Sequence, residues 1–94
     1  MIKTFADNET EKIFNLQFSR ALPSDIQRII LRKLIMLDSA ENINDLRIPP
    51  SNHLEKLTGK LKGQYSIRVN SQYRICFRIF NYNEIYDVRV TDYH

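Results

Sequence analysis

Four arginines in the C-terminal third of the sequence fall at alternate positions of β-like segments: Arg68, Arg74, Arg78 and Arg89. Because strand side chains alternate between two faces, this spacing predicts that the four guanidinium groups share one face of a sheet. Guanidinium groups suit phosphate contacts and stack on bases. Arginines so placed also commonly pair with carboxylates such as Asp87 on a neighbouring strand. The sequence leaves both interpretations open.

The last three residues, Asp92, Tyr93 and His94, add a carboxylate, a phenol and an imidazole. If the final strand runs to its end, we expect Tyr93 and His94 to lie at the mouth of the basic face, where they could transfer protons. Alternation points Asp92 away from Tyr93, so orienting a neighbour or closing the strand suits Asp92 as well as direct catalysis. Fraying of all three is the plainer interpretation.

A segment without helical or strand periodicity, residues 41–63, carries His53 and Lys56. Loops of this length are uncommon in compact domains and are often functional. Leucines spaced three and four apart predict one helical turn that places His53 and Lys56 a turn apart: Leu54, Leu57 and Leu61. A lone histidine or lysine in a loop is nevertheless more often an ordinary surface residue.

The residue types offer little for a metal ion or another cofactor. Two histidines and one cysteine, Cys76, make a weak ligand set, since zinc sites normally need three or four protein ligands. Neither a phosphate-binding glycine loop nor a GxSxG motif is present. We therefore expect no metal and no cofactor. A single cysteine also cannot form an internal disulfide, which fits a reducing compartment.

The first 40 residues predict a short strand and two helices. Residues 2–5 alternate like a strand, and Asp7 or Asn8 caps a helix that runs to about residue 16. Ser24 and Gln27 have the spacing of a capping box for a second helix, which runs to about residue 40. Its buried stripe is expected to comprise Ile26, Ile29, Ile30, Leu34 and Leu37. Three cations lie away from most of that stripe and are expected in solvent: Arg28, Arg32 and Lys33.

Three runs rich in aromatic and β-branched residues predict an antiparallel meander: 64–70, 73–80 and 84–93. Alternation assigns the core face to Tyr65, Ile67, Val69, Ile75, Phe77, Ile79, Tyr86, Val88 and Val90. It assigns the opposite, basic face to Arg68, Asn70, Arg74, Cys76, Arg78, Asp87, Arg89, Thr91 and Tyr93. The predicted fold class is α+β, with the N-terminal strand and two helices packed on a small, mainly antiparallel β-sheet in a single domain over residues 1–94.

The composition is that of an ordinary globular protein, with 43% hydrophobic and 27% charged residues. No apolar run approaches the roughly 20 residues that span a bilayer, and the N-terminus turns acidic where a signal peptide is apolar. We expect a soluble, cytoplasmic protein with no membrane association. The net charge of +3 permits a polyanionic partner without requiring one.

Several short motifs, taken in order, resemble HigB-type toxins of the RelE/ParE superfamily. They are LRIPPSNHLE at residues 46–55, LTG at 57–59, YSIRVN at 65–70, QYRICF at 72–77 and DYH at 92–94. The resemblance covers essentially the whole chain, and its most specific parts are the R-x-P-P-x-N segment and the D-Y-H end. Tyr73 stands where many relatives carry tryptophan, and Lys56 lies in a segment where the family varies.

The resemblance implies a bacterial type II toxin that cleaves messenger RNA in the ribosomal A site. It also implies a HigA-like antitoxin with a helix-turn-helix domain, through which the pair would associate with operator DNA. By the same likeness the functional positions are His53, Lys56, Arg68, Asn70, Arg74, Asp92, Tyr93 and His94. Arg78 and Arg89 are added as RNA-binding candidates because they share the basic face.

A metal-independent endoribonuclease needs a base for the 2′-hydroxyl, cations for the phosphate and an acid for the departing 5′-oxygen. Arg74 and Arg68 would hold the phosphate, and His53 or Lys56 would share proton transfer with His94. Tyr93 would stack on or orient a base. Two other functions stay open: a ParE-like gyrase inhibitor without nuclease activity, and an RNA-binding module that leaves RNA intact.

Overall fold

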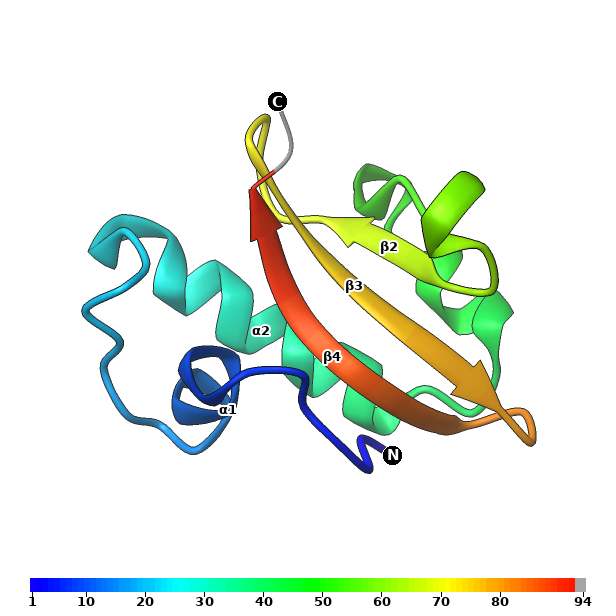
Figure 1. The fold of residues 1–94 in the computed structure, drawn as a ribbon, viewed down its shortest axis with the longest axis horizontal. Coiled ribbons are helices and arrows are strands. Elements are labelled where there is room, and N and C mark those ends of the chain that lie inside the picture. The colour runs from blue at the N-terminus through cyan, green and yellow to red at the C-terminus, as the bar shows by residue number, and fades with distance from the viewer. Residues whose placement is uncertain (93–94) are drawn as a thin grey trace.

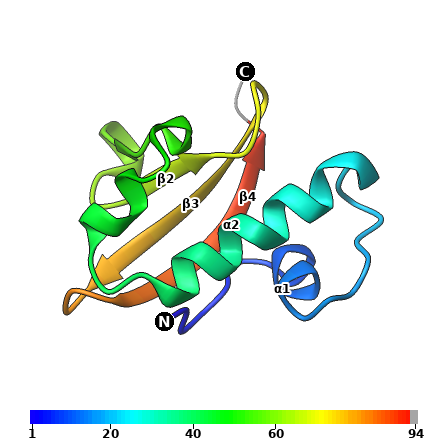
Figure 2. The same cartoon turned by 180° about the vertical axis from the view of Figure 1, so that it is seen from behind.

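Two helices pack against one face of a twisted four-stranded sheet, and Figure 2 shows the longer helix lying across that face. The structure is a computed structural model that describes residues 1–92. Its main elements are α1 (Asn8–Phe14), α2 (Gln27–Ser39), β1 (Glu55–Lys56), β2 (Tyr65–Arg68), β3 (Tyr73–Phe80) and β4 (Glu84–Asp92) (Figure 1). The strands follow chain order, and each neighbouring pair is antiparallel. The predicted α+β class is confirmed.

The first residues form an incomplete strand beside β4. Ile2 and Phe5 make isolated parallel bridges to Ile85 and Val88, so residues 2–5 follow the outer edge of the sheet without forming a full strand. Main-chain hydrogen bonds run in both directions along this seam, including Lys3 N to Ile85 O at 2.7 Å. The predicted N-terminal strand is therefore present only as these bridges.

The core lies between α2 and the sheet. Ile30, Leu34 and Leu37 on α2 are fully buried, as the helical spacing predicts. They meet buried residues of the sheet: Ile67, Ile75, Phe77, Ile85 and Val88. Ile29 is only half-buried, because it sits at the edge of the stripe.

A β-bulge changes the predicted faces of β4. The register between β3 and β4 shifts between Cys76 and Arg78, and Asp87 on the opposing strand has a φ of 56°. The extra residue turns both Ile85 and Val88 toward the core. Tyr86, predicted in the core, instead pairs with Arg78 on the basic face. Strict alternation fails here because it assumes one residue per position on both strands.

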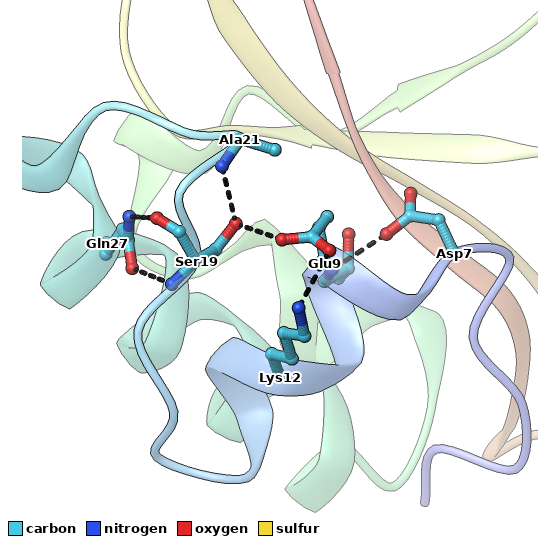
Figure 3. Close-up of polar contacts among 7 residues, drawn as sticks. Asp7, Glu9, Lys12, Ser19, Ala21 and Gln27 are labelled. Atoms are coloured by element: carbon cyan, nitrogen blue, oxygen red, sulfur yellow. Dashed lines mark hydrogen bonds and ion pairs between the residues drawn. The ribbon is translucent and has the colours of Figure 1, made fainter.

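Of the two predicted helix caps, only the cap of α1 is confirmed. Asp7 caps α1, and its Oδ1 accepts a hydrogen bond from Thr10 N at 2.7 Å. Ser24 opens a 3₁₀ turn, Ser24–Ile26, and caps nothing with its side chain. The capping box is therefore wrong. Gln27 turns back to Ser19, donating to its carbonyl at 2.6 Å and accepting from its N–H at 3.0 Å (Figure 3).

Replacing Gln27 with alanine should lower the free energy of unfolding by about 1–3 kcal/mol, the cost of leaving buried polar groups without partners. The Gln27 amide also donates to Leu22 O at 2.9 Å, and Ser19 is fully buried. Urea unfolding followed by circular dichroism would measure the loss. Gln17→Ala, at an exposed position of the same connection, should stay within about 0.5 kcal/mol of wild type. Equal losses in both variants would contradict this role.

Glu9 makes the same network sensitive to acid. A hydrogen bond from Ser19 Oγ, 2.7 Å from Glu9 Oε1, lowers the pKa of Glu9 from 4.5, and Lys12 lowers it further (Figure 3). A carboxyl with a lowered pKa stabilises the fold above its unfolded-state pKa, and that stabilisation is lost as pH falls through the folded-state value. Glu9→Gln should therefore flatten the fall of unfolding free energy below about pH 4.5. Parallel curves for the two proteins, from urea titrations, would contradict this.

Neither helix in residues 1–92 is long and apolar enough to cross a membrane.

Candidate functional site

A pocket of about 380 Å³ opens where the loop before β1 meets the turn between β2 and β3. It is lined by His53, Glu55, Arg68, Asn70, Ser71 and Arg74. Four of the residues singled out in the sequence thus lie together: His53, Arg68, Asn70 and Arg74. The lining carries two guanidinium groups and one carboxylate, so its charge favours an anion.

Arg74 is fixed in the floor of this pocket and is 8% exposed. Its Nε donates to Ser66 Oγ at 2.7 Å, and its Nη2 donates to the backbone carbonyls of His53 and, at 3.3 Å, Ser66. These acceptors are neutral. The nearest opposite charge is Glu55, 3.9 Å from Nη1 and itself more than half exposed. The guanidinium is therefore rigidly held while its charge is only weakly balanced.

Arg68 stands directly opposite Arg74 in the antiparallel pair of β2 and β3. Directly opposed like charges destabilise a sheet, so a group that balances their charge would stabilise this pair. The Arg68 Nε donates to the backbone carbonyl of Asn70 at 3.1 Å, again a neutral acceptor. An anion bound between the two guanidinium groups would relieve the repulsion and gain charge-assisted hydrogen bonds.

Asn70 shapes the turn beside the pocket. Its Oδ1 accepts hydrogen bonds from Gln72 N at 2.9 Å and Tyr73 N at 2.7 Å. Such side-chain to backbone bonds are typical of asparagine in turns. The side-chain oxygen is therefore used to hold the turn that joins Arg68 to Arg74.

His53 enters the pocket from the end of a 3₁₀ turn, Pro50–Asn52. It is the C-cap of that turn, with a left-handed backbone at φ 43° and ψ 57°, and it is exposed. The backbone carbonyl of His53 holds Arg74, and the residue also lines the cavity. Because His53 is exposed and lines the pocket, its imidazole is available for proton transfer to a group bound there.

Lys56 does not join this group. The predicted helical turn is wrong, because Glu55 and Lys56 form β1 and pair with Ser66 and Tyr65 of β2. Alternation then puts Glu55 on the face of Arg74 and Lys56 on the opposite face. Glu55 was missed in the sequence; the only signal for it was the position between His53 and Lys56.

Arg78 and Arg89 share the face of Arg74 but lie outside the pocket lining. Arg78 Nε pairs with Asp87 Oδ2 at 3.2 Å, the carboxylate pairing that the sequence had left open. Arg89 Nη1 donates to Gln64 Oε1 at 2.7 Å. Arg78 thus pairs across the strands, and Arg89 contacts the residue just before β2. The four predicted arginines therefore divide into two that line the pocket and two that are engaged outside it.

The C-terminal candidates are only partly described. Asp92 is the last residue of β4 and pairs with Tyr73. By alternation, the side chain of Asp92 therefore lies on the face of the sheet opposite that of Arg74. The Oδ2 of Asp92 accepts a hydrogen bond from Nε2 of Gln72, which lies in the turn between β2 and β3, at 3.1 Å. Tyr93 and His94 lie outside the described residues. Among residues 1–92, no three histidine, cysteine or carboxylate side chains gather as a metal site.

Comparison with known families gives a match along nearly the whole chain. Residues 3–94 match the model of the HigB-like toxins, described as RelE-like toxins of the type II toxin–antitoxin system HigB. The chain belongs to this family. It is 54% identical to the toxin HigB-1 of Vibrio cholerae over 59 residues, a stretch that makes up 63% of this chain. It is 52% identical to an uncharacterized protein of Haemophilus influenzae over 64 residues, or 68% of this chain. The matched stretch spans 62% of the length of each relative.

Two solved structures share the fold of this HigB-like chain. A chain of the YoeB–YefM toxin–antitoxin complex from Staphylococcus aureus superposes with a TM-score of 0.62 at 23% identity, covering 100% of this chain and 95% of the other. YafQ from Escherichia coli gives a TM-score of 0.56 at 14% identity, covering 98% and 93%. These identities are low, so the likeness extends to the arrangement of helices and strands alone.

Proposed function

We propose that this HigB-like chain is a metal-independent endoribonuclease that cleaves messenger RNA on the ribosome and so blocks translation. The observation that carries the proposal is the opposed pair Arg68 and Arg74 beside His53 in an open pocket. Family membership supports a toxin role, and a HigA-like helix-turn-helix antitoxin is the proposed partner, through which the pair would contact operator DNA. A cytoplasmic location follows from a ribosomal target.

In the proposed mechanism, arginines bind the phosphate and other side chains transfer protons. Arg74 and Arg68 bind the scissile phosphate and stabilise the charge that builds on it in the transition state. Among the described candidates for proton transfer, His53 is favoured over Lys56, because His53 lines the pocket and Lys56 faces the other side of β1. His94 is proposed as the second proton-transfer group, and Tyr93 as the group that stacks on or orients a base.

The remaining candidates have supporting roles in this proposal. Asn70 acts through the turn that sets the spacing of the two pocket arginines. Arg78 and Arg89 extend the positive face toward flanking phosphates, each after exchange of its present partner for RNA. Asp92 orients the end of β4, from which Tyr93 and His94 continue.

A cell-free translation reaction tests the proposal. Purified protein is added to a defined messenger RNA with and without ribosomes, and new RNA ends are mapped by primer extension. We expect cuts at discrete in-frame positions only when ribosomes are present, and their loss when a HigA-like antitoxin is added first. Intact RNA with a folded protein would overturn the nuclease. Gyrase supercoiling and salt-dependent RNA binding would then be measured.

A further inference from the structure

A buried lysine on α2 sits among the core positions of the helix. Lys33 was predicted in solvent, yet it is 7% exposed and neighbours the fully buried Leu34. Burial, with a smaller effect of Arg32, lowers the pKa of Lys33. Its Nζ donates to Asn52 Oδ1, a neutral amide rather than a carboxylate. Burying an ammonium group is costly unless it is hydrogen-bonded, so the contact with Asn52 offsets part of that cost.

Asn52 connects that lysine to the loop that carries the site. Asn52 is fully buried, and its Nδ2 donates to Leu46 O at 3.1 Å and Ile48 O at 3.3 Å. Its amide is thus satisfied on both ends, by the lysine and by two carbonyls of the preceding segment. The side chain fixes the 3₁₀ turn, Pro50–Asn52, whose next residue is His53.

The residue after Asn52 lines the pocket. His53 follows Asn52 directly, and its backbone carbonyl accepts a hydrogen bond from Arg74 Nη2. Its left-handed conformation, φ 43°, is strained for a residue with a side chain and needs support on both sides. That support comes from Asn52 before it and Arg74 beside it. A continuous set of contacts therefore runs from α2 to the guanidinium in the pocket.

We propose that Lys33, acting through Asn52, is a positioning residue that holds His53 and Arg74 in the geometry the anion pocket requires. Lys33 touches neither the pocket nor any group bound there, so its effect is indirect. The proposal rests on the proposed nuclease function for its consequence in cleavage. Its structural part, the placement of Arg74, stands independently of what the pocket binds.

Lys33→Met tests the proposal, because methionine fits the apolar surroundings but cannot donate to Asn52. On programmed ribosomes we expect kcat to fall about tenfold to a hundredfold, the scale of a misplaced reacting group, with little change in KM. In nuclear magnetic resonance spectra of the free protein, the Arg74 Nε–H signal should shift or broaden, while methyl signals of Val88 stay in place. The matched control, Arg32→Met, removes an exposed cation from the same helix and should change neither measurement.

The outcomes separate the two proposals. A folded Lys33→Met protein with wild-type cleavage and an unmoved Arg74 signal would overturn the positioning role. If wild type leaves RNA intact, the nuclease fails, and the Arg74 signal alone decides the positioning role. If Lys33→Met does not fold, Lys33→Gln keeps a polar group there but is too short to hold Asn52 in place. The same displacement of the Arg74 signal is expected in that variant, and its absence would contradict the proposal.

Discussion

Replacing Arg74 with alanine should slow ribosome-dependent cleavage by about a hundredfold or more, the scale for losing one electrostatic donor at a reacting centre. Arg74 is 8% exposed, and Ser66 and the His53 carbonyl hold its side chain, so its position is set before substrate arrives. A preorganised cation stabilises the transition state without the cost of ordering it during the reaction. Single-turnover cleavage on programmed ribosomes would measure the effect.

Two further variants test whether the effect of Arg74→Ala comes from the guanidinium group of Arg74. Arg74→Lys keeps a positive charge but loses the planar guanidinium fork, so it should recover only part of the rate. Arg20→Ala removes an exposed arginine of the connection between the helices and should cleave like wild type. Circular dichroism must show that each variant is folded. Wild-type rates in a folded Arg74→Ala protein would remove Arg74 from the mechanism.

Phe77→Ala should cost about 3–5 kcal/mol of unfolding free energy, a large part of the 5–15 kcal/mol typical of a domain. Phe77 is fully buried, and its ring stacks on that of Tyr65 with centroids 6.1 Å apart. Alanine would leave a cavity between α2 and the sheet that the surrounding residues cannot fill. Urea unfolding would measure the loss.

Phe80→Ala is the matched control for that core substitution. Phe80 lies at the end of the same strand but is 53% exposed, so its removal should cost far less. A loss below about 1 kcal/mol in Phe77→Ala, or equal losses in the two variants, would mean that the site collapses around the smaller side chain.

Local patterns predicted the elements whose causes are local. The stripe of Ile30, Leu34 and Leu37 follows from helical spacing, and Asp7 caps α1 as expected. The meander was predicted because short polar turns separate its strands. Ser24 misled because an N-cap pattern cannot show that Gln27 has a better set of partners at Ser19, eight residues away. The bulge at Asp87 was likewise not predicted, because strict alternation of side chains allows no extra residue in a strand.

The chemical types of the residues, more than their expected positions on strands and turns, predicted which side chains line the pocket. Arg68, Arg74 and His53 share a pocket, as expected from the basic face and the loop. The two-residue strand β1 was not predicted, because such a short strand has no periodicity of its own and depends on pairing with β2. This is why Glu55 was missed. Roles for Tyr93, His94 and the other site candidates stay predictions.

Lys33 and Asn52 show a general limit of sequence patterns. Helical spacing puts Lys33 three residues from Ile30 and four from Leu37, beside the buried stripe. A lysine at such a position is nevertheless exposed in most proteins. Its partner is far along the chain, in a loop without periodicity. Only the packing of α2 against that loop brings the two together, so the contact belongs to the tertiary structure.

The first residues of the chain cover the outer edge of β4. An uncovered strand edge offers unpaired N–H and C=O groups to other molecules and promotes aggregation. Residues 2–6 occupy that edge through Lys3 and Ala6, and Thr10 Oγ1 accepts from Val90 N further along. At the other end of the sheet, β1 is only two residues long. Neither edge offers a long template for a second chain, so the protein should remain dispersed at concentrations where an open sheet of this size would aggregate.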